Sequence, residues 1–345
     1  MPNFSIATLH RLGCDILKQA GTNHDDANIV VAELLDANLV GHDSHGVIRL
    51  KQYVDSITAG EIKPGTEIHT VLSSPGVTVI DGSFNFGQVV AAQALKRAQE
   101  EATKSVTHTV LCRNTNHVGR LGSYTRKAAI EGFAALMAVN GPANFSVLPW
   151  GGLDPRLGTN PISLAAPCKH DPFVLDMTTS ATAEGKIRVA TQAGESIPEG
   201  LIVDELGNSA TDPNAFYQGG AILPFGGVLG FKGYGLGVML DIFCGVLSGA
   251  GVARDDVTPS TNGVWLQVID VKQVVSAHDY ESMMNTYVEW IKSSRTAPGV
   301  EEILLPGEIE SQRRAHHKEK GISLSEGTWN QMQELADSLN VAIPD

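Results

Sequence analysis

Apolar strands alternate with helical patterns through the middle of the chain, and this alternation limits the possible folds more than any other feature. Helical patterns occur at 88–103, 122–131, 181–193 and 233–249. Apolar runs typical of strands occur at 67–72, 77–80, 107–112, 133–139, 162–166, 173–176, 200–203 and 264–268. Because helices that alternate with apolar strands pack on the faces of a sheet, we predict an α/β fold with a sheet covered by helices.

Both ends of the chain carry helical patterns of their own. Three helices are expected before residue 60, and the third runs from about His45 to Ala59. Two more are expected at 307–319 and 325–339. A chain of 345 residues is long enough for about two domains of roughly 150 residues each. We therefore predict a helical domain built from residues 1–75 with 305–345, and an α/β domain spanning 76–304.

The charge of the chain excludes one class of partner. Its formal net charge is −13 and it holds no dense run of Lys or Arg, whereas a nucleic acid requires a basic face. An acidic protein also creates no general field that attracts an anionic substrate. If the substrate is an anion, individual Arg or Lys side chains must therefore hold it.

Cysteine usage and hydropathy favour a cytoplasmic protein. The four cysteines are scattered and form no CxxC pair, which suits a reducing compartment. The first residues lack the basic and apolar regions of a signal peptide. The most apolar stretch, 233–253, is rich in glycine and interrupted by Asp241, so a buried helix is expected there and not a membrane span.

The most informative segment is GHDSHGVIR at 41–49, at the expected start of a helix, where free N–H groups favour an anion. His45 and Arg49 are four residues apart and would share one helical face. A guanidinium can bind a carboxylate through two hydrogen bonds while an imidazole gives a proton to a neighbouring carbonyl oxygen. The pair thus suits a 2-oxo acid. The same residues also fit a helix start that Asp43 or Ser44 caps, with a solvated His45.

A second candidate is the polar loop NTNHVG at 114–119, which follows the strand that ends at Cys112. Ligands of α/β sheets gather beyond the carboxyl ends of strands, so His117 is a candidate acid, base or substrate-orienting group. A turn in which Asn side chains satisfy their own backbone explains the loop equally well.

Asp176 ends the strand at 173–176 and is a third candidate. A carboxylate in such a position can orient an imidazole and stabilise its charged form. The competing interpretation is that Asp176 caps the following helix.

The glycine-rich run LGFKGYGLG at 229–237 does not match the dinucleotide-binding pattern, because Val238 stands where its third glycine belongs. A loop of this kind with one lysine could still hold a pyrophosphate, or its glycines could let a buried helix pack closely. No HExxH motif or Cys/His quartet occurs, and we expect no metal.

Eight short motifs stand in a fixed order along almost the whole chain, from about residue 4 to 340. They are DSHGVIR (43–49), NTNHVG (114–119), PWGG (149–152), GTNP (158–161), LDMTTS (175–180), GK (185–186), KGYGL (232–236) and LPGE (305–308). The ordered set resembles the type-2 malate/L-lactate dehydrogenase family. That family also contains ureidoglycolate dehydrogenases, 2,3-diketogulonate reductases, sulfolactate dehydrogenases and piperideine-2-carboxylate reductases.

The resemblance implies an oxidoreductase that moves a hydride between NAD(H) or NADP(H) and C2 of a small 2-oxo or 2-hydroxy acid. It also implies a non-Rossmann nicotinamide-binding sheet and a homodimer. A cyclic-imine reductase and a 2,3-diketogulonate-type reductase are the alternatives on the same scaffold. Outside that class, a non-catalytic protein that binds an organic anion and a metal-dependent hydrolase are the competing interpretations.

The resemblance also assigns roles to residues. His45 would donate the proton, Ser44 and Asp176 would form its relay, and Arg49 would bind the substrate carboxylate. His117 matches a position that acts as an acid or base in some members. Arg120 stands where a small residue is usual, and it could contact a dicarboxylate or a bulkier acid. The cofactor would contact Asn140, Gly141, Pro172, Phe173, Val174, Leu175, Asp176, Met177, Thr178, Phe231, Lys232, Gly307, Glu308 and Ile309.

Overall fold

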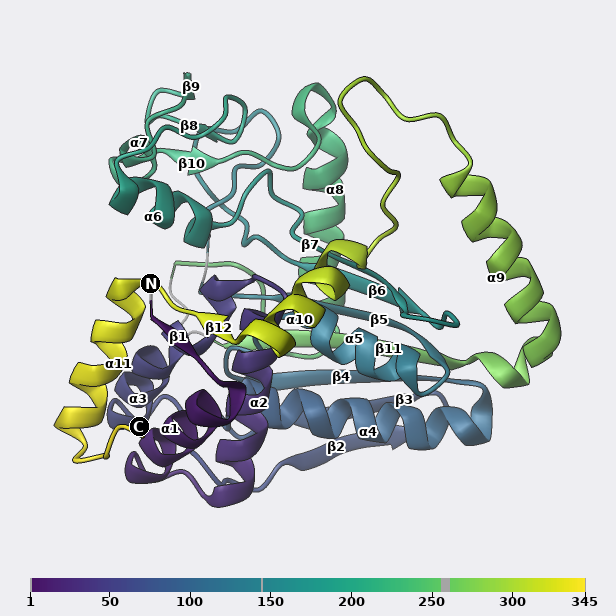
Figure 1. Ribbon diagram of the computed structural model, residues 1–345, viewed down its shortest axis with the longest axis horizontal. Coiled ribbons are helices and arrows are strands. Elements are labelled where there is room, and N and C mark those ends of the chain that lie inside the picture. The colour runs from purple at the N-terminus through teal and green to yellow at the C-terminus, as the bar shows by residue number, and fades with distance from the viewer. Residues whose placement is uncertain (1, 144, 256–260, 345) are drawn as a thin grey trace.

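The centre of the computed structural model, which describes residues 2–143, 145–255 and 261–344, is a seven-stranded sheet (Figure 1). In spatial order its strands are β2 (His69–Ser74), β3 (Val77–Asp81), β4 (Thr107–Thr115), β11 (Asn262–Asp270), β5 (Phe133–Asn140), β6 (Ile162–Ala166) and β7 (Phe173–Met177). Within this described sheet, β3 and β4 pair in parallel and the other neighbours pair antiparallel.

One face of the sheet is covered by α4 (Gly87–Ser105) and α5 (Leu121–Ile130). In α4, Val90, Ala94 and Ala98 recur every four residues, so they share one helical face, and all are fully buried. They pack against strand residues such as Val110 and Val264 in a continuous core. The prediction of an α/β fold whose sheet is packed with helices is confirmed.

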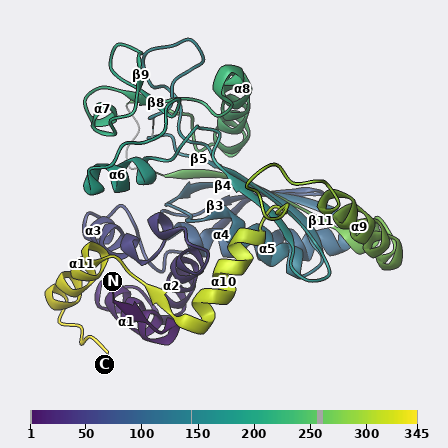
Figure 2. The ribbon, with the colours of Figure 1, turned by 45° about the horizontal axis from the view of Figure 1, so that its top comes forward.

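The other face is partly covered by α8 (Phe231–Leu240) and by the π-helical turn η4 (Asp241–Val246), which contact β5 and β11. The expected helix at 233–249 is therefore present as an α-helix followed by a π-turn. A helix α9 (Ala277–Lys292) stands away from the body of the molecule (Figures 1 and 2).

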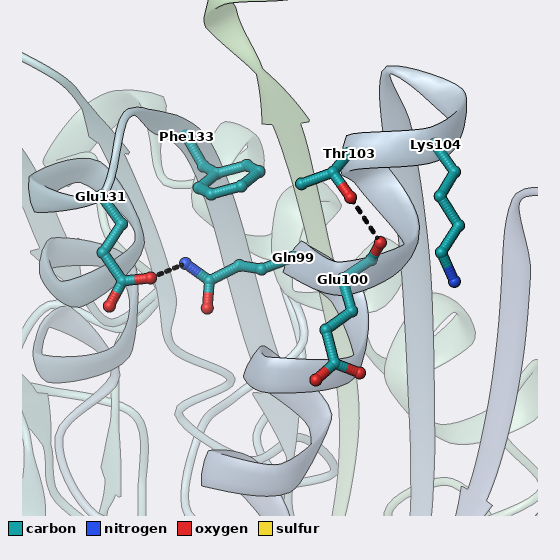
Figure 3. Close-up of a pocket in the computed structure, with 6 residues that line it drawn as sticks. All are labelled: Gln99, Glu100, Thr103, Lys104, Glu131 and Phe133. Carbon is teal, nitrogen blue, oxygen red and sulfur yellow. Dashed lines mark hydrogen bonds between the residues drawn. The ribbon is translucent and has the colours of Figure 1, made fainter.

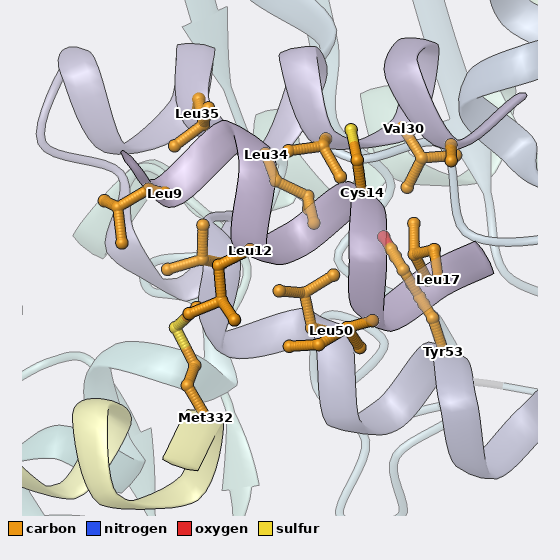
Figure 4. Close-up of a cluster of buried hydrophobic side chains, with 14 of the residues drawn as sticks. Leu9, Leu12, Cys14, Leu17, Val30, Leu34, Leu35, Leu50, Tyr53 and Met332 are labelled. Atoms are coloured by element: carbon orange, nitrogen blue, oxygen red, sulfur yellow. The ribbon is translucent and has the colours of Figure 1, made fainter. Parts of the chain in front are cut away.

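Helices from both ends of the chain share a separate core (Figure 4). It joins α1 (Ile6–Gln19), α2 (His24–Leu39), α3 (Leu50–Thr58) and α11 (Glu326–Ser338). Leu12, Leu34 and Leu50 are almost completely buried there, together with Met332 from α11. A two-stranded pairing of β1 (Asn3–Phe4) with β12 (Ile322–Ser323) ties the two ends together. α10 (Glu308–Lys320) packs against α2.

A small third layer lies beyond the main sheet. Its helices are α6 (Glu184–Ala193) and α7 (Asn214–Tyr217), and its strands are β8 (Ile202–Val203), β9 (Ser209–Ala210) and β10 (Ala221–Ile222). Its core includes Ile187, Ile202 and Ile222, all fully buried. α6 lies on the side of this layer that faces α3 (Figure 2). No helix among the described residues has the length and apolarity needed to cross a bilayer.

Candidate active site

The backbone around His45 differs from the expected helix. The segment forms two separate 3-10 turns, η1 (Asp43–His45) and η2 (Val47–Arg49), and Gly46 between them is extended. The side chain of Asn38 in α2 accepts a hydrogen bond from the N–H of Val47 at 2.9 Å. A Cβ at position 46 would collide with that Asn38 side chain. The prediction of one helix from His45 to Ala59 is therefore wrong in its first turn, because the Val47 N–H bonds to Asn38 of α2 and not to a carbonyl group of the same segment.

His45 and Arg49 are nevertheless brought together, through Ser44. The Ser44 hydroxyl lies 3.1 Å from His45 Nδ1, and Arg49 Nε donates to the Ser44 carbonyl at 2.7 Å. Arg49 Nη1 donates to Gln52 at 2.7 Å. Arg49 Nη2 has no hydrogen-bond partner among the described residues. One edge of the guanidinium is thus open to a carboxylate.

His117 lies just beyond β4, and its ring stacks beside that of His45. The two ring centroids are 5.6 Å apart and the planes differ by 25°. The Tyr53 hydroxyl in α3 lies 2.8 Å from His117 Nδ1, and Gln88 Nε2 in α4 donates to the Tyr53 oxygen at 2.6 Å. Two imidazoles far apart in the sequence therefore meet at one place, each with a hydroxyl partner.

Both imidazoles are neutral at pH 7. Burial, with the positive charge of Arg49, lowers the pKa of His45 to about 3. Burial likewise lowers the pKa of His117 well below its usual value. A neutral imidazole can accept a proton from a hydroxyl group. To act as an acid, the imidazole must first become protonated. A nearby negative charge favours this because it raises the pKa of the imidazole.

α6 forms the opposite side of the site. A Cβ on Gly185, in its first turn, would lie 3.0 Å from the Ser44 Cβ, so the helix approaches Ser44 closely. Glu184 and Arg188 are near enough to influence the pKa of Arg49. The site is therefore bounded by α3 with η1 and η2 on one side and by α6 on the other (Figure 2).

A charged cluster lies next to these residues. Asp36 accepts from Arg314 Nη1 at 2.6 Å and from Arg120 Nη2 at 2.9 Å. Arg120 also lies 3.4 Å from Asp176, and its side chain is only 4% exposed. Both terminal nitrogens of Arg120 thus donate to carboxylates, whereas its buried Nε has no hydrogen-bond partner among the described residues.

Asp176 is held by the start of α5. It accepts a hydrogen bond from the Gly122 N–H at 2.8 Å, and Arg120 is its charged neighbour. Burial raises the pKa of Asp176 against the opposing effect of Arg120. Among the described residues it makes no hydrogen bond with Ser44 or His45, so the proposed relay stays a prediction.

Most of the residues expected to bind the cofactor lie in or beside β7, at the start of α8 and in the turn before α10. The turn before α10 packs on β7, since the Val174 N–H donates to the Pro306 carbonyl at 3.0 Å and Gly307 there has φ +94°. Exposed positions are Leu175, Phe231, Lys232 and Ile309, whereas Phe173, Val174, Asp176, Met177, Thr178, Gly307 and Glu308 are half-buried. Pro172 lines a cavity of about 660 Å³ beside the β6–β7 turn.

Asn140 and Gly141 stand at the end of β5. The Asn140 side chain is fully buried and donates to Asp241 at 2.7 Å and to the Gly251 carbonyl at 2.9 Å. It therefore fixes the backbone near the end of β5, and half-buried Gly141 follows it directly.

A shallow hollow of about 460 Å³ at the other end of α4 is not part of this site (Figure 3). Gln99 and Glu131 hydrogen-bond across it at 2.9 Å, and Glu100 and Lys104 also line it. Gln99 lies roughly 16 Å along the helix axis from Gln88, given the rise per residue of an α-helix. No cluster of three or more potential metal ligands occurs in the described part of the chain.

Sequence reasoning missed three residues of this region: Tyr53, Gln88 and Asp36. Tyr53 stands four residues after Arg49, which was a usable signal for a shared location. Gln88 is a fully buried polar residue within an apolar helix face, but its burial is visible only in the fold. Asp36 lies within an ordinary amphipathic helix, and its partners come from distant parts of the chain.

Comparison with known proteins assigns the chain to a family. The family model described as malate/L-lactate dehydrogenase matches residues 4–333. The chain belongs to this family. It is 36% identical to a malate dehydrogenase of Pyrococcus horikoshii, over 94% of this chain and 92% of that protein.

Solved structures agree with this membership. A malate dehydrogenase from Entamoeba histolytica superimposes with a TM-score of 0.95 at 26% identity, covering 100% of this chain and 99% of that one. A delta1-piperideine-2-carboxylate reductase from Pseudomonas syringae superimposes with a TM-score of 0.84 at 28% identity, covering 97% and 100%. The chain is thus an oxidoreductase of a family whose members act on hydroxy acids.

Proposed function

We propose that this protein transfers a hydride between NAD(P)H and C2 of a small 2-oxo acid, and reverses that reaction with the 2-hydroxy acid. The observation that carries the proposal is the placement of His45 beside Arg49, whose guanidinium has one open edge. Membership of the malate/L-lactate dehydrogenase family supplies the reaction class. The nicotinamide, when bound, supplies or accepts the hydride.

The residues around β7 fit such a cofactor. Exposed apolar side chains at Leu175 and Phe231 offer surfaces for flat rings, and exposed Lys232 offers a positive charge for a pyrophosphate. The left-handed Gly307 packs on Val174, so a side chain there would crowd β7. The proposal therefore places the cofactor on a mostly antiparallel sheet and not on a doubly wound parallel one.

The proton chemistry follows from the charges of the site. The substrate carboxylate pairs with Arg49, and the negative charge raises the pKa of the neighbouring His45. His45 then takes up a proton and delivers it to the C2 oxygen as the hydride reaches C2. In the oxidation direction the neutral imidazole, already present in the free protein, accepts the hydroxyl proton. Ser44 orients the His45 ring through Nδ1.

Arg49 gives the first prediction. Arg49→Ala should lower kcat/KM for a 2-oxo acid by about 10²–10³-fold. This loss corresponds to roughly 3–4 kcal/mol, which lies within the range for removing one partner of a buried charge pair. Steady-state kinetics with the acid and with its neutral amide measure this, and the loss should be much smaller for the amide. Equal losses for both compounds would contradict the assignment of Arg49 to the carboxylate.

The reaction itself is tested by following NADH and NADPH oxidation with a panel of 2-oxo acids, 2,3-diketogulonate and cyclic imines. We expect turnover of a 2-oxo acid. The similarity to a piperideine-2-carboxylate reductase favours one alternative, in which the hydride goes to a C=N carbon. Turnover of the cyclic imine alone would establish that alternative. Binding of neither cofactor would instead favour a protein that only holds an organic anion.

We also propose that the protein is a homodimer. On α9, Met283, Tyr287 and Trp290 are spaced three and four residues apart, form one apolar stripe, and are 58%, 57% and 76% exposed. Exposed apolar stripes of this kind mark protein–protein interfaces.

Light scattering during size-exclusion chromatography should therefore give twice the 36.6 kDa mass of one chain. Trp290→Glu should shift the mass towards that of one chain, because it places a charge in the apolar interface. Glu289→Gln, on the other side of α9, is the matched control and should remain dimeric. A monomeric wild-type protein would contradict the proposal.

We also propose that the chain forms the two domains expected from the sequence. Residues 1–75 with 305–345 would provide His45 and Arg49 on the substrate side and also contribute dimer contacts. Residues 76–304 would hold most of the cofactor. We place the protein in the cytoplasm, because its four cysteines are free in the structure and a reducing compartment keeps them so.

A further inference from the structure

The hydrogen-bond chain behind His117 determines which of its ring nitrogens carries the proton. Gln88 Nε2 donates to the Tyr53 oxygen at 2.6 Å, and this oxygen lies 2.8 Å from His117 Nδ1. A hydroxyl has one proton to donate. Among the described residues these are the only two hydrogen-bond partners of the tyrosine oxygen, and Gln88 Nε2 can only donate. The phenol proton is therefore paired only if His117 Nδ1 is unprotonated and accepts it.

The surroundings keep this chain intact. Tyr53 is 1% exposed and Gln88 is fully buried, so water does not compete for their hydrogen bonds. Burial raises the pKa of Tyr53 to about 12, which keeps the phenol proton in place. Burial lowers the pKa of His117, which keeps its ring neutral. A neutral ring with a bare Nδ1 carries its proton on Nε2.

The other end of this chain of hydrogen bonds is His117 Nε2. Among the described residues no group accepts a hydrogen bond from His117 Nε2, and the ring lies beside His45 and is not fully buried. We propose that Gln88 is a positioning residue which, through Tyr53, locks His117 as an Nε2–H hydrogen-bond donor to the substrate oxygen. The two histidines then have separate tasks, since His45 moves the proton and His117 holds the oxygen in place.

The orientation of the Gln88 amide and the tautomer of His117 are linked. The Gln88 amide oxygen is buried and has no partner among the described residues. If the amide turned over, its oxygen would accept the tyrosine proton. His117 would then have to donate from Nδ1, and Nε2 would present a lone pair. Such a lone pair would repel the oxygen of an anionic substrate, so only one of the two arrangements suits the proposed reaction.

The tautomer is measured directly by long-range ¹H–¹⁵N correlation NMR of the intact protein labelled with ¹⁵N-histidine, near neutral pH. His117→Gln assigns the signals. We expect His117 Nδ1 at the downfield shift of a bare nitrogen and Nε2 at the shift of a protonated one. A protonated Nδ1 in the wild-type protein would overturn the proposal. Although the role of His117 rests on the proposed function, this readout requires no turnover.

Two variants test whether Gln88 fixes the tautomer of His117. Gln88→Met removes the amide donor, so the Nδ1 and Nε2 shifts should move towards each other as both tautomers become populated. Tyr53→Phe should do the same, and serves if Gln88→Met does not fold. We expect kcat/KM to fall about 10-fold or more in Gln88→Met, the loss typical of residues that orient a functional histidine. Gln99→Met, on the exposed end of the same helix, is the control. Unchanged His117 shifts in Gln88→Met would remove Gln88 from the proposal.

Discussion

His45→Gln lowers kcat for reduction of the 2-oxo acid by about 10²–10⁴-fold, the range for loss of a positioned general acid, and leaves the protein folded. Glutamine can still form a hydrogen bond, but it cannot carry the proton. Because the pKa of His45 in the free protein is about 3, its charged form is scarce near pH 7. The wild-type kcat/KM for reduction should therefore fall as the pH rises, whereas that for oxidation should not, and the variant should lose this difference.

The control for this variant is His24→Gln, which replaces an exposed histidine at the start of α2. It should match the wild-type protein in kcat and in its pH profile. Steady-state rates of both reaction directions between about pH 5 and pH 9, with circular dichroism to confirm folding, provide the measurement. Full activity of His45→Gln would exclude His45 as the proton carrier, and loss of the pH slope in His117→Gln alone would transfer that role to His117.

Asp36→Asn lowers the free energy of unfolding by about 3–5 kcal/mol, the cost of breaking a buried ion pair from one side. The change leaves the guanidiniums of Arg120 and Arg314, whose side chains are 4% and 11% exposed, without their shared carboxylate. Urea denaturation at pH 7 measures the loss. The exposed pair Lys51–Asp55 is the matched control, and Asp55→Asn should change stability by less than about 1 kcal/mol. A loss of similar size in both variants would contradict the prediction.

The ion pairs of Asp36 also make the stability of the protein depend on pH. Burial acts to raise the pKa of Asp36, but the hydrogen bonds and charges of Arg314 and Arg120 outweigh it and lower the pKa to about 2 from 3.8. A carboxyl whose pKa is lowered by folding stabilises the protein fully above its unfolded pKa. That stabilisation is lost as the pH falls from about 4 towards 2. Asp36→Asn should lose less stability than the wild-type protein over this window.

The sequence was sufficient for the general architecture because periodic patterns report on local structure. The helix at 88–103 and the strands at 107–112 and 133–139 were expected close to where α4, β4 and β5 lie. The detail at Gly46 was not accessible in this way. Its extended backbone depends on Asn38, a residue of another helix, and a periodic pattern carries no information about such a contact.

The candidate site shows the same limit. His45, Arg49 and His117 were selected from their motifs, and the fold brings all three together. Their partners Tyr53 and Gln88 come from two different helices and hydrogen-bond to each other across 35 positions of sequence. The expected substrate contact of Arg120 stays a prediction, and its ion-pair partners Asp36 and Asp176 come from distant parts of the chain. Sequence spacing cannot reveal hydrogen bonds and ion pairs between residues that lie so far apart in the chain.

In the proposed reaction a hydride from the nicotinamide reaches C2 of a 2-oxo acid. The transfer can be followed with NADH or NADPH doubly deuterated at C4 and the 2-oxo acid that the protein turns over. Mass spectrometry and NMR then locate the deuterium in the product. We expect one deuterium on C2 of the 2-hydroxy acid, and the rate of its formation should fall strongly in His45→Gln. Turnover of a 2-oxo acid without deuterium at C2, or no turnover of any 2-oxo acid with either cofactor, would contradict it.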